Sequence, residues 1–412
     1  MSYLKNKIIN DPIYGFIHIP FESIWKLMGH PYFQRLRRIS QLGLSSLVYP
    51  GANHNRFHHA IGSMHLMNKS IEILKSKNHN ITEEEHEGSL IAILLHDIGH
   101  GPFSHALENS IVKNLSHEKI SIMFMHKLNV EFNGKLSLAI DIFTRKYKKK
   151  FLHQLISSQL DVDRLDYLNR DSFYSGVNEG IINSNRIIEM LNVKENELVI
   201  DYKGIYSIEK FIIARKLMYW QVYLHKTVLS AEHTLMHILQ RAKHLIEKNN
   251  TIYTTPSFKT FLYQKEEITE SFFIANDLLE EFALIDDYDI LVCMKNWTKE
   301  NDKVLSILSK TIINRNLLKM IPIKEEEREK ELKRIRKVAM HKFNVHEEDV
   351  KYLVFSITTK NETYNFNDEE IVFLKKNNNL VKLSDTKNEF SMNRKNAKII
   401  KHYICYPQGC VI

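Results

Sequence analysis

Apolar side chains recur every three or four positions along much of the chain, which is the pattern of amphipathic helices. From Phe57 to Ser76, for example, Met64, Met67, Ile71 and Leu74 keep this spacing. Thr82 begins a capping box, followed by three glutamates, that predicts the start of another helix. The helices predicted in this way span residues 20–38, 57–76, 82–96, 107–115, 117–128, 135–145, 151–171, 184–191 and 208–248.

Alternating apolar and polar residues, which are typical of strands, occur in short segments only. They predict extended chain at residues 17–19 and 44–49, and a hairpin formed by residues 198–202 and 206–208. After helices that reach about residue 337, alternation returns at Tyr352, Val354 and Ser356, and again at Tyr364 and Phe366. We therefore expect a mainly α protein, with a helical core at 1–250 and a helical, then α+β, C-terminal lobe at 251–412.

One apolar stretch ends abruptly in a group of polar residues. Leu90 to Leu95 runs directly into His96 and Asp97, and Gly99 and Pro102 then prevent the helix from continuing. Neighbouring helical residues point about 100° apart, so His96 and Asp97 reach one ion only at a frayed helix end, or they flank two ions.

Further metal-ligand types lie upstream and downstream of this turn. His59 follows a turn signal and a polar run, and Asp163 lies in the acidic stretch from Asp161 to Tyr167. Imidazole and carboxylate groups together suit Zn, Mn, Fe, Co or Mg. A single buried histidine is more often a hydrogen-bonded core residue, but His59, His96, Asp97 and Asp163 together predict a site for a divalent metal ion.

Composition sets broad limits on function. The 412 residues suffice for a sizeable core, and 43% apolar with 26% charged residues is typical of globular proteins. The net charge of +8 is compatible with polyanionic ligands; nucleic acid is permitted but not indicated. Three cysteines without metal-ligand spacing favour a reducing compartment. With no apolar run of membrane length and no signal-peptide core, we expect a cytoplasmic protein that does not enter the membrane.

Several longer motifs follow one another in a fixed order over roughly the first 230 residues. They are NDPIYG (10–15), FQRLRRISQLG (33–43), YPGANHNRF (49–57), HDIGHGPFSH (96–105), DVDRLDYLNRD (161–171) and YLHK (223–226). In this order they resemble the HD-domain metal-dependent phosphohydrolases. They are most similar to the deoxynucleoside triphosphate triphosphohydrolase branch, which includes the sterile-alpha-motif and HD-domain enzyme of animals.

This resemblance implies roles for individual residues. It assigns the metal to His59, His96, Asp97 and Asp163, and the substrate phosphates to Arg56, Arg164 and Arg215. Lys226 is a further candidate because phosphate groups require positive charge. It places the Gln41–Leu42 pair at the deoxyribose, where leucine would exclude a 2′-hydroxyl. Asp171 would then accept a hydrogen bond from the 3′-hydroxyl, and Tyr167 and Tyr223 would form aromatic walls. Without the resemblance, the arginines would be interpreted as surface charges and Leu42 and Tyr223 as core residues.

Three histidines that follow the turn are candidates for acid–base chemistry. A histidine titrates near neutrality and can donate a proton to a leaving oxygen. The candidates are His100, His105 and His117. By resemblance, His105 and His117 match family histidines at the phosphate end, and Glu108 matches a carboxylate that orients a histidine. The alternative for His117 is a polar residue at a helix N-terminus.

The resemblance also implies partners and leaves alternatives open. The family forms dimers or tetramers, often with nucleotide effectors, and Lys7, Gln34 and Arg37 match positions of such a regulatory nucleotide site. The expected reaction is hydrolysis of deoxynucleoside triphosphates to deoxynucleoside and triphosphate. The first alternative is an HD phosphohydrolase that acts on mono- or diphosphates or on signalling nucleotides. The second is a nucleotide- or nucleic-acid-binding regulator with a vestigial site.

Overall fold

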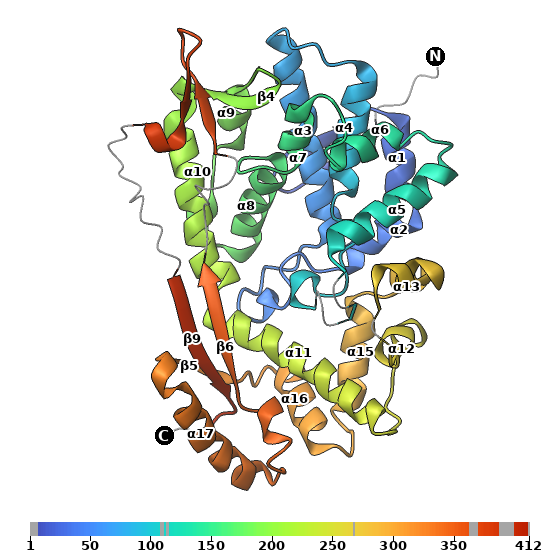
Figure 1. Cartoon of the computed structure of the whole chain (residues 1–412), viewed down its shortest axis with the longest axis vertical. Helices are drawn as coiled ribbons and strands as arrows, with labels where there is room; N and C mark the ends of the chain where they lie inside the picture. The colour runs from blue at the N-terminus through green and yellow to red at the C-terminus, as the bar shows by residue number, and fades with distance from the viewer. Residues whose placement is uncertain are drawn as a thin grey trace.

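The computed structural model describes residues 7–107, 111–112, 115–266, 268–361, 370–386 and 399–410, and it is mainly α-helical (Figure 1). The helices of the N-terminal part are α1 (Glu22–Gly29), α2 (Pro31–Gln34), α3 (Arg56–Ser76), α4 (Glu83–Leu95), α5 (His117–Glu131), α6 (Ser137–Phe143), α7 (Lys150–Ile156), α8 (Val162–Ser175), α9 (Ser184–Glu189), α10 (Ile205–Met218) and α11 (Lys226–Glu247). Those that follow are α12 (Pro256–Leu262), α13 (Glu270–Ala275), α14 (Leu278–Leu284), α15 (Asp287–Trp297), α16 (Lys303–Ile313) and α17 (Arg328–Phe343). The strands are β1 (Lys7–Asp11), β2 (Gly15–Ile19), β3 (Leu191–Lys194), β4 (Glu197–Asp201), β5 (Lys319–Ile323), β6 (Phe355–Asn361), β7 (Val372–Leu374), β8 (Leu380–Lys382) and β9 (Ile399–Tyr406).

Helices α3, α4 and α8 form the centre of the N-terminal part. Helix α3 packs against both α4 and α8, so residues on several of its faces are buried. The Thr82 capping box predicted from the sequence is present: the Thr82 side chain accepts from Glu85 N, and the Glu85 side chain accepts from Thr82 N. The predicted helices at 57–76, 82–96 and 117–128 are confirmed within one to three residues.

The predicted helix at 151–171 is wrong as a single element. It is divided into α7 and α8, because the chain between them turns and Asp161 begins a new helix. The Asp161 side chain accepts a hydrogen bond from Arg164 N at 2.8 Å, which is the geometry of an N-cap. Asp163 therefore lies in the first turn of α8, at the end of the helix that faces α4.

Three shorter predictions also need correction. Residues 44–49 contain a 3₁₀ turn at Ser45–Leu47 instead of a strand. The hairpin is formed by β3 and β4, because Glu195 and Asn196 adopt positive φ angles of 54° and 64° that suit a two-residue hairpin loop; residues 206–208 belong to α10. The predicted helix at 107–115 lies partly outside the described residues, and Ile111 and Val112 are not helical.

The C-terminal part combines helices with short strands. Strands β5, β9 and β6 form an antiparallel sheet, and β7 pairs in parallel with β4 of the N-terminal part. Helix α11 runs across the molecule between these regions and packs against α16 and β5 (Figure 1). The predicted strand at Tyr364 and Phe366 lies outside the described residues, and the domain boundary near residue 250 stays a prediction. No described helix is long and apolar enough to cross a membrane.

Candidate active site

Two buried histidines point their Nε2 atoms toward the same space. The Nδ1 atom of His96 donates to the carbonyl oxygen of Ile93 at 2.6 Å, and that of His59 is 2.7 Å from Asp166 Oδ2. When Nδ1 carries the proton in this way, Nε2 keeps a free lone pair and can bind a metal ion. Both histidines are therefore held in the tautomer that a metal site needs.

The carboxylates of Asp97 and Asp163 complete this group. His59 Nε2 is 3.0 Å from Asp163 Oδ1 and 3.6 Å from Asp97 Oδ2, and His96 Nε2 is 3.7 Å and 3.4 Å from oxygens of the same two carboxylates. Ligand atoms that surround one ion at bond lengths of about 2.0–2.2 Å lie about 3.0–3.6 Å apart. The spacing of His59, His96 and Asp163 therefore suits one divalent ion, and Asp97 lies beside them with a different oxygen toward each histidine.

Hydrogen bonding and charge support the same assignment. Among the described residues, Nε2 of His59 and Nε2 of His96 are buried without a hydrogen-bond partner of acceptable geometry. Burial lowers the pKa of His59, but the nearby carboxylates of Asp163 and Asp166 outweigh it and raise this pKa to about 10. Burial raises the pKa of Asp97, but Arg56 and the neighbouring histidines hold it well below its usual range. The group thus favours a positive charge at its centre.

A strained turn carries the residues after Asp97. Phe103 and Ser104 have φ angles of 54° and 52°, a left-handed conformation that side chains other than those of Gly, Asn and Asp rarely adopt. The Asp287 carboxylate accepts from Phe103 N at 2.6 Å, and Ser104 Oγ donates to Ser40 O at 2.6 Å. These bonds hold the backbone in place and direct His105 toward the cavity.

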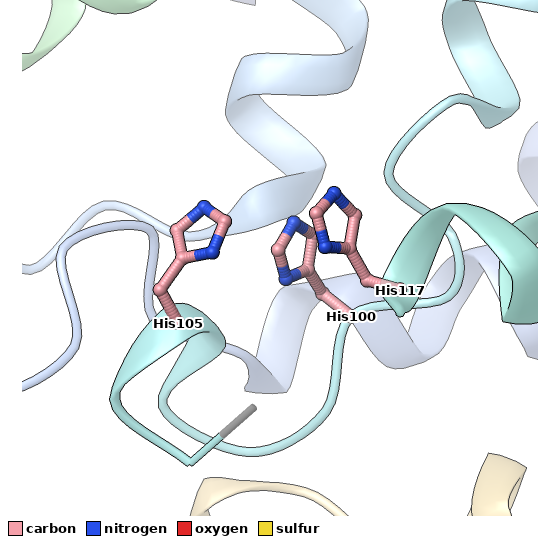
Figure 2. A group of neighbouring side chains, drawn as sticks. All are labelled: His100, His105 and His117. Carbon is pink, nitrogen blue, oxygen red and sulfur yellow. The ribbon is translucent and has the colours of Figure 1, made fainter. Parts of the chain in front are cut away.

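His100, His105 and His117 form a second group of neighbouring side chains (Figure 2). Their ligand atoms lie within 4.8 Å of one another, but the rings of His100 and His117 are stacked, with centroids 3.9 Å apart and planes inclined by 16°. Imidazole lone pairs lie in the ring plane, so two stacked rings cannot both direct theirs at one ion about 2.0–2.1 Å away. This geometry suits proton transfer better than a second metal ion.

The environments of these histidines differ. His100 is buried, its Nε2 lies 3.4 Å from Asp97 Oδ1, and burial together with nearby Arg56 holds its pKa well below the ordinary value. His105 is exposed to the cavity and His117 is partly exposed. Glu108, the predicted partner of a histidine, lies outside the described residues.

A cavity of about 410 Å³ opens beside both groups, a size that is typical of small-ligand sites. It is lined by Asp97 and Asp163 of the metal site, by His100, His105 and His117, and by the predicted substrate residues Gln41, Leu42, Arg56, Arg164, Tyr167, Asp171, Arg215 and Tyr223. Lys226, at the first position of α11, is exposed and is not among the lining residues.

The three predicted phosphate-binding arginines have different surroundings. Arg56 is buried and pairs with Asp97, while its Nε donates to Ser104 Oγ at 2.9 Å. Arg164 pairs with Asp161, and its pKa is raised because this carboxylate outweighs the effect of burial. The Nε atoms of Arg164 and Arg215 are buried and have no hydrogen-bond partner among the described residues. Both Arg164 and Arg215 also line the cavity, so their positive charge can meet an anion there.

The predicted sugar and base residues form the polar and aromatic wall of the cavity. Asp171 accepts from Tyr223 Oη at 2.7 Å, and its other oxygen lies 2.7 Å from His54 Nε2. The rings of Tyr167 and Tyr223 are in edge contact, with centroids 6.2 Å apart. Asp171 is therefore already fixed in place by two side chains, one of which, His54, the sequence analysis did not single out.

The predicted regulatory residues lie in the N-terminal elements. Arg37 Nε donates to Gln34 Oε1 at 2.8 Å, and its guanidinium lies 3.6 Å from the centre of the Phe57 ring. Lys7 lies over the Trp25 ring, 4.9 Å from its centre. A role for Lys7, Gln34 and Arg37 in binding a nucleotide stays a prediction.

Asp166, Asp287 and Glu232 are functional candidates that sequence reasoning missed. Asp166 follows Asp163 by three residues, so the helical period could have indicated that both lie on one face of α8. Asp287 and Glu232 come from distant parts of the chain, and no local pattern places them at the cavity.

Comparisons with known proteins support the family resemblance. The HD domain model matches residues 56–171, and the model of the HD associated region matches residues 182–255. A crystal structure of a phosphohydrolase from Bacteroides thetaiotaomicron is 46% identical, with a TM-score of 0.93 over 98% of this chain and 100% of that chain. The uncharacterized protein YwfO of Bacillus subtilis is 34% identical over 78% of this chain and 73% of its own length. A protein of Dictyostelium discoideum named deoxynucleoside triphosphate triphosphohydrolase SAMHD1 homolog is 34% identical over 56% of this chain, which spans 48% of that protein.

Proposed function

The chain belongs to the HD-domain family of phosphohydrolases, and we propose that it hydrolyses deoxynucleoside triphosphates to deoxynucleoside and triphosphate. The observation that carries this proposal is the shared cavity, which is lined by two predicted metal ligands, Asp97 and Asp163, by Arg164 and Arg215, and by the histidine group. The name of the Dictyostelium relative supports the substrate class.

The residues divide into three roles in this proposal. His59, His96, Asp97 and Asp163 would hold the metal ion, which when bound supplies positive charge to phosphoryl oxygens and acidifies water. The substrate carries several negative charges that repel a nucleophile, so cationic groups at the phosphates are needed. Arg164 and Arg215, which line the cavity, bind these oxygens.

Proton transfer falls to the histidine group. Attack on the α-phosphorus breaks the bond to the 5′-oxygen of the deoxynucleoside, and this oxygen needs a proton as it leaves. His105 lines the cavity and donates this proton, either by itself or with His117 as its source. Leu42 packs against C2′ of the sugar, and Tyr167 and Tyr223 enclose it.

Product analysis in ¹⁸O water tests the proposal. Purified protein is given each deoxynucleoside triphosphate with Mn, Mg, Fe, Co or Zn, and the products are separated by chromatography. We expect equal amounts of deoxynucleoside and triphosphate, with the label in the triphosphate. His105→Ala should lose far more kcat than substrate affinity, because a general acid acts mainly in the transition state. Label in orthophosphate, with a diphosphate product remaining, would instead indicate an HD phosphohydrolase of a different specificity.

A further inference from the structure

A continuous chain of buried hydrogen bonds connects His59, a predicted metal ligand, to the N-terminal hairpin. Asp166, which lies 2.7 Å from His59 Nδ1, accepts from Arg170 Nε at 2.9 Å and from Nη2 at 3.0 Å. The third nitrogen of Arg170, Nη1, donates to Asp11 Oδ2 at 2.8 Å, at the end of β1. Each of these four residues is at most 7% exposed.

Asp11 also determines the shape of the hairpin. Its Oδ1 accepts from the backbone nitrogens of Ile13 and Tyr14, at 2.9 and 3.0 Å, and so closes the turn between β1 and β2. One carboxylate therefore holds both the turn and Arg170. A change in the turn moves a charged partner of the group that orients His59.

The packing of α3 leaves room for this chain. Gly62 lies one turn after His59 on α3, and a Cβ atom at Gly62 would lie 2.1 Å from Asp166 Oδ1 and 2.2 Å from Arg170 Nη2. Any other residue at this position would displace the Asp166–Arg170 pair. The close approach of α3 to the ion pair is thus a second observation, independent of the hydrogen bonds.

We propose that Asp11 and Arg170 are positioning residues that act through Asp166 on His59, so that the β1–β2 hairpin and the metal site are energetically coupled. The inference rests on the metal site of the proposed function. A carboxylate behind a ligating histidine fixes its ring and raises its basicity, and it does so only while its own position is fixed. Arg170 holds Asp166 in place by donating to it from two nitrogens, and the Asp11 carboxylate balances the positive charge of Arg170. Because coupling is reciprocal, metal binding must also stabilise the hairpin.

Binding of Co²⁺, followed by its visible absorption spectrum, tests the outer end of the chain. Asp11→Asn keeps the shape of the side chain but removes its charge. We expect this variant to bind Co²⁺ about 2- to 30-fold more weakly, with an altered spectrum. Asp201→Asn is the matched control, because Asp201 pairs with Lys77 at 3.0 Å, about 27 Å along α3 from His59. Unchanged affinity and spectrum in a folded Asp11→Asn variant would refute the coupling.

Arg170→Lys tests the middle of the chain, since lysine keeps the charge but cannot make the two-nitrogen contact. The control is Arg241→Lys, because Arg241 likewise connects two carboxylates, Asp302 and Asp349, in the C-terminal part. Both variants should lose thermal stability, but only Arg170→Lys should change the Co²⁺ spectrum. Equal spectra in the two variants would contradict the proposal.

Hydrogen exchange tests the coupling on the unmodified protein, so the result does not depend on whether a variant folds. The amides of Ile13 and Tyr14 report on Asp11, and we expect both to exchange more slowly when Co²⁺ is bound. The amide of Leu305, which donates to Asp302 Oδ1 at 2.8 Å, is the matched reference and should not change. Normal Co²⁺ binding without slower exchange at the hairpin would overturn this inference alone. Failure of the unmodified protein to bind Co²⁺ would overturn both the metal site and the coupling.

Discussion

At the scale of single residues, the cavity wall contains a carboxyl group, that of Glu232, whose pKa is raised by its surroundings. Glu232 lines the cavity, and burial raises its pKa to about 8 from an ordinary value of 4.5. Between these two values the folded chain holds a proton at Glu232 that the unfolded chain has released. The contribution of Glu232 to stability is therefore fully present below about pH 4.5 and is lost as the pH rises through about 8.

Glu232→Gln should remove this pH dependence. Glutamine resembles the protonated acid in shape and stays neutral, so the variant should gain in melting temperature, relative to the unmodified protein, as the pH rises from 5 to 9. Thermal unfolding at several pH values measures the difference. Glu347→Gln, at an exposed position, is the control and should show no such trend. A constant difference between Glu232→Gln and the unmodified protein over this range would show that Glu232 is not buried as a neutral acid.

Leu42 is the residue from which sugar discrimination is expected. It is half-buried, lines the cavity and packs against the hydrophobic core. If its side chain excludes a 2′-hydroxyl, the unmodified protein should hydrolyse deoxynucleotides faster than ribonucleotides. Leu42→Gly should narrow the ratio of the two kcat/KM values by about tenfold or more. Equal rates on both sugars before the mutation would remove the reason to place Leu42 at the sugar.

At the scale of elements, the turn after α4 depends on the close approach of α5. Ser121 of α5 accepts from Gly99 N at 2.9 Å and donates to His96 O at 2.8 Å, so one hydroxyl satisfies two backbone groups of the turn. A Cβ atom at Gly99 would lie 2.2 Å from His117 O and 2.4 Å from Ser121 N. Only glycine lets the two elements meet at this distance.

Gly99→Ala should therefore push α5 away and separate His117 from His100. We expect a loss of about 1–3 kcal/mol in the free energy of unfolding, as for other overpacked sites, and a drop in turnover. Urea unfolding and activity measurements check both. Gly101→Ala is the control in the same turn, because its Cβ would meet Phe282 at 3.4 Å, an ordinary contact. Equal stability of the two variants would contradict this account of the turn.

The elements also show what the sequence could and could not predict. The start of α4 was predictable because the Thr82 capping box is local, and the proximity of His96 and Asp97 follows from their adjacency. The break before α8 was not predictable in this way, because residues 157–160 contain no Gly or Pro. In the structure, the hydrogen bonds of Asp161 reveal it. Arg56 was predicted at the phosphates from the resemblance, whereas its contact with buried Asp97 depends on how α3 and α4 pack.

At the scale of the whole molecule, the segment at the start of α15 contacts two loops that line the cavity. This segment lies outside the residues that the HD domain model matches. Arg35 Nε donates to Ile285 O at 3.0 Å, and Arg38 pairs with Asp286. The two oxygens of Asp287 accept from Ser40 N at 2.8 Å and from Phe103 N at 2.6 Å. These two backbone groups precede Gln41 and Ser104, both of which line the cavity.

We therefore expect that a chain ending at residue 250 does not form a working site, although it contains every predicted metal ligand. It would lose Asp287 and with it the hydrogen bonds that this carboxylate accepts from Ser40 N and Phe103 N, and a hydrogen bond to a charged group contributes about 1.5–3 kcal/mol. It would also uncover the face of α11 that packs against α16. Asp287→Ala in the full chain separates these effects: its melting temperature and turnover should fall while Co²⁺ still binds, because Asp287 accepts from Ser40 N and Phe103 N and not from the predicted metal ligands. Lys295→Ala, at an exposed position of the same helix, should leave all three measurements unchanged. Full turnover by residues 1–250 alone would show that the C-terminal part is not needed to hold the strained turn at Phe103 and Ser104.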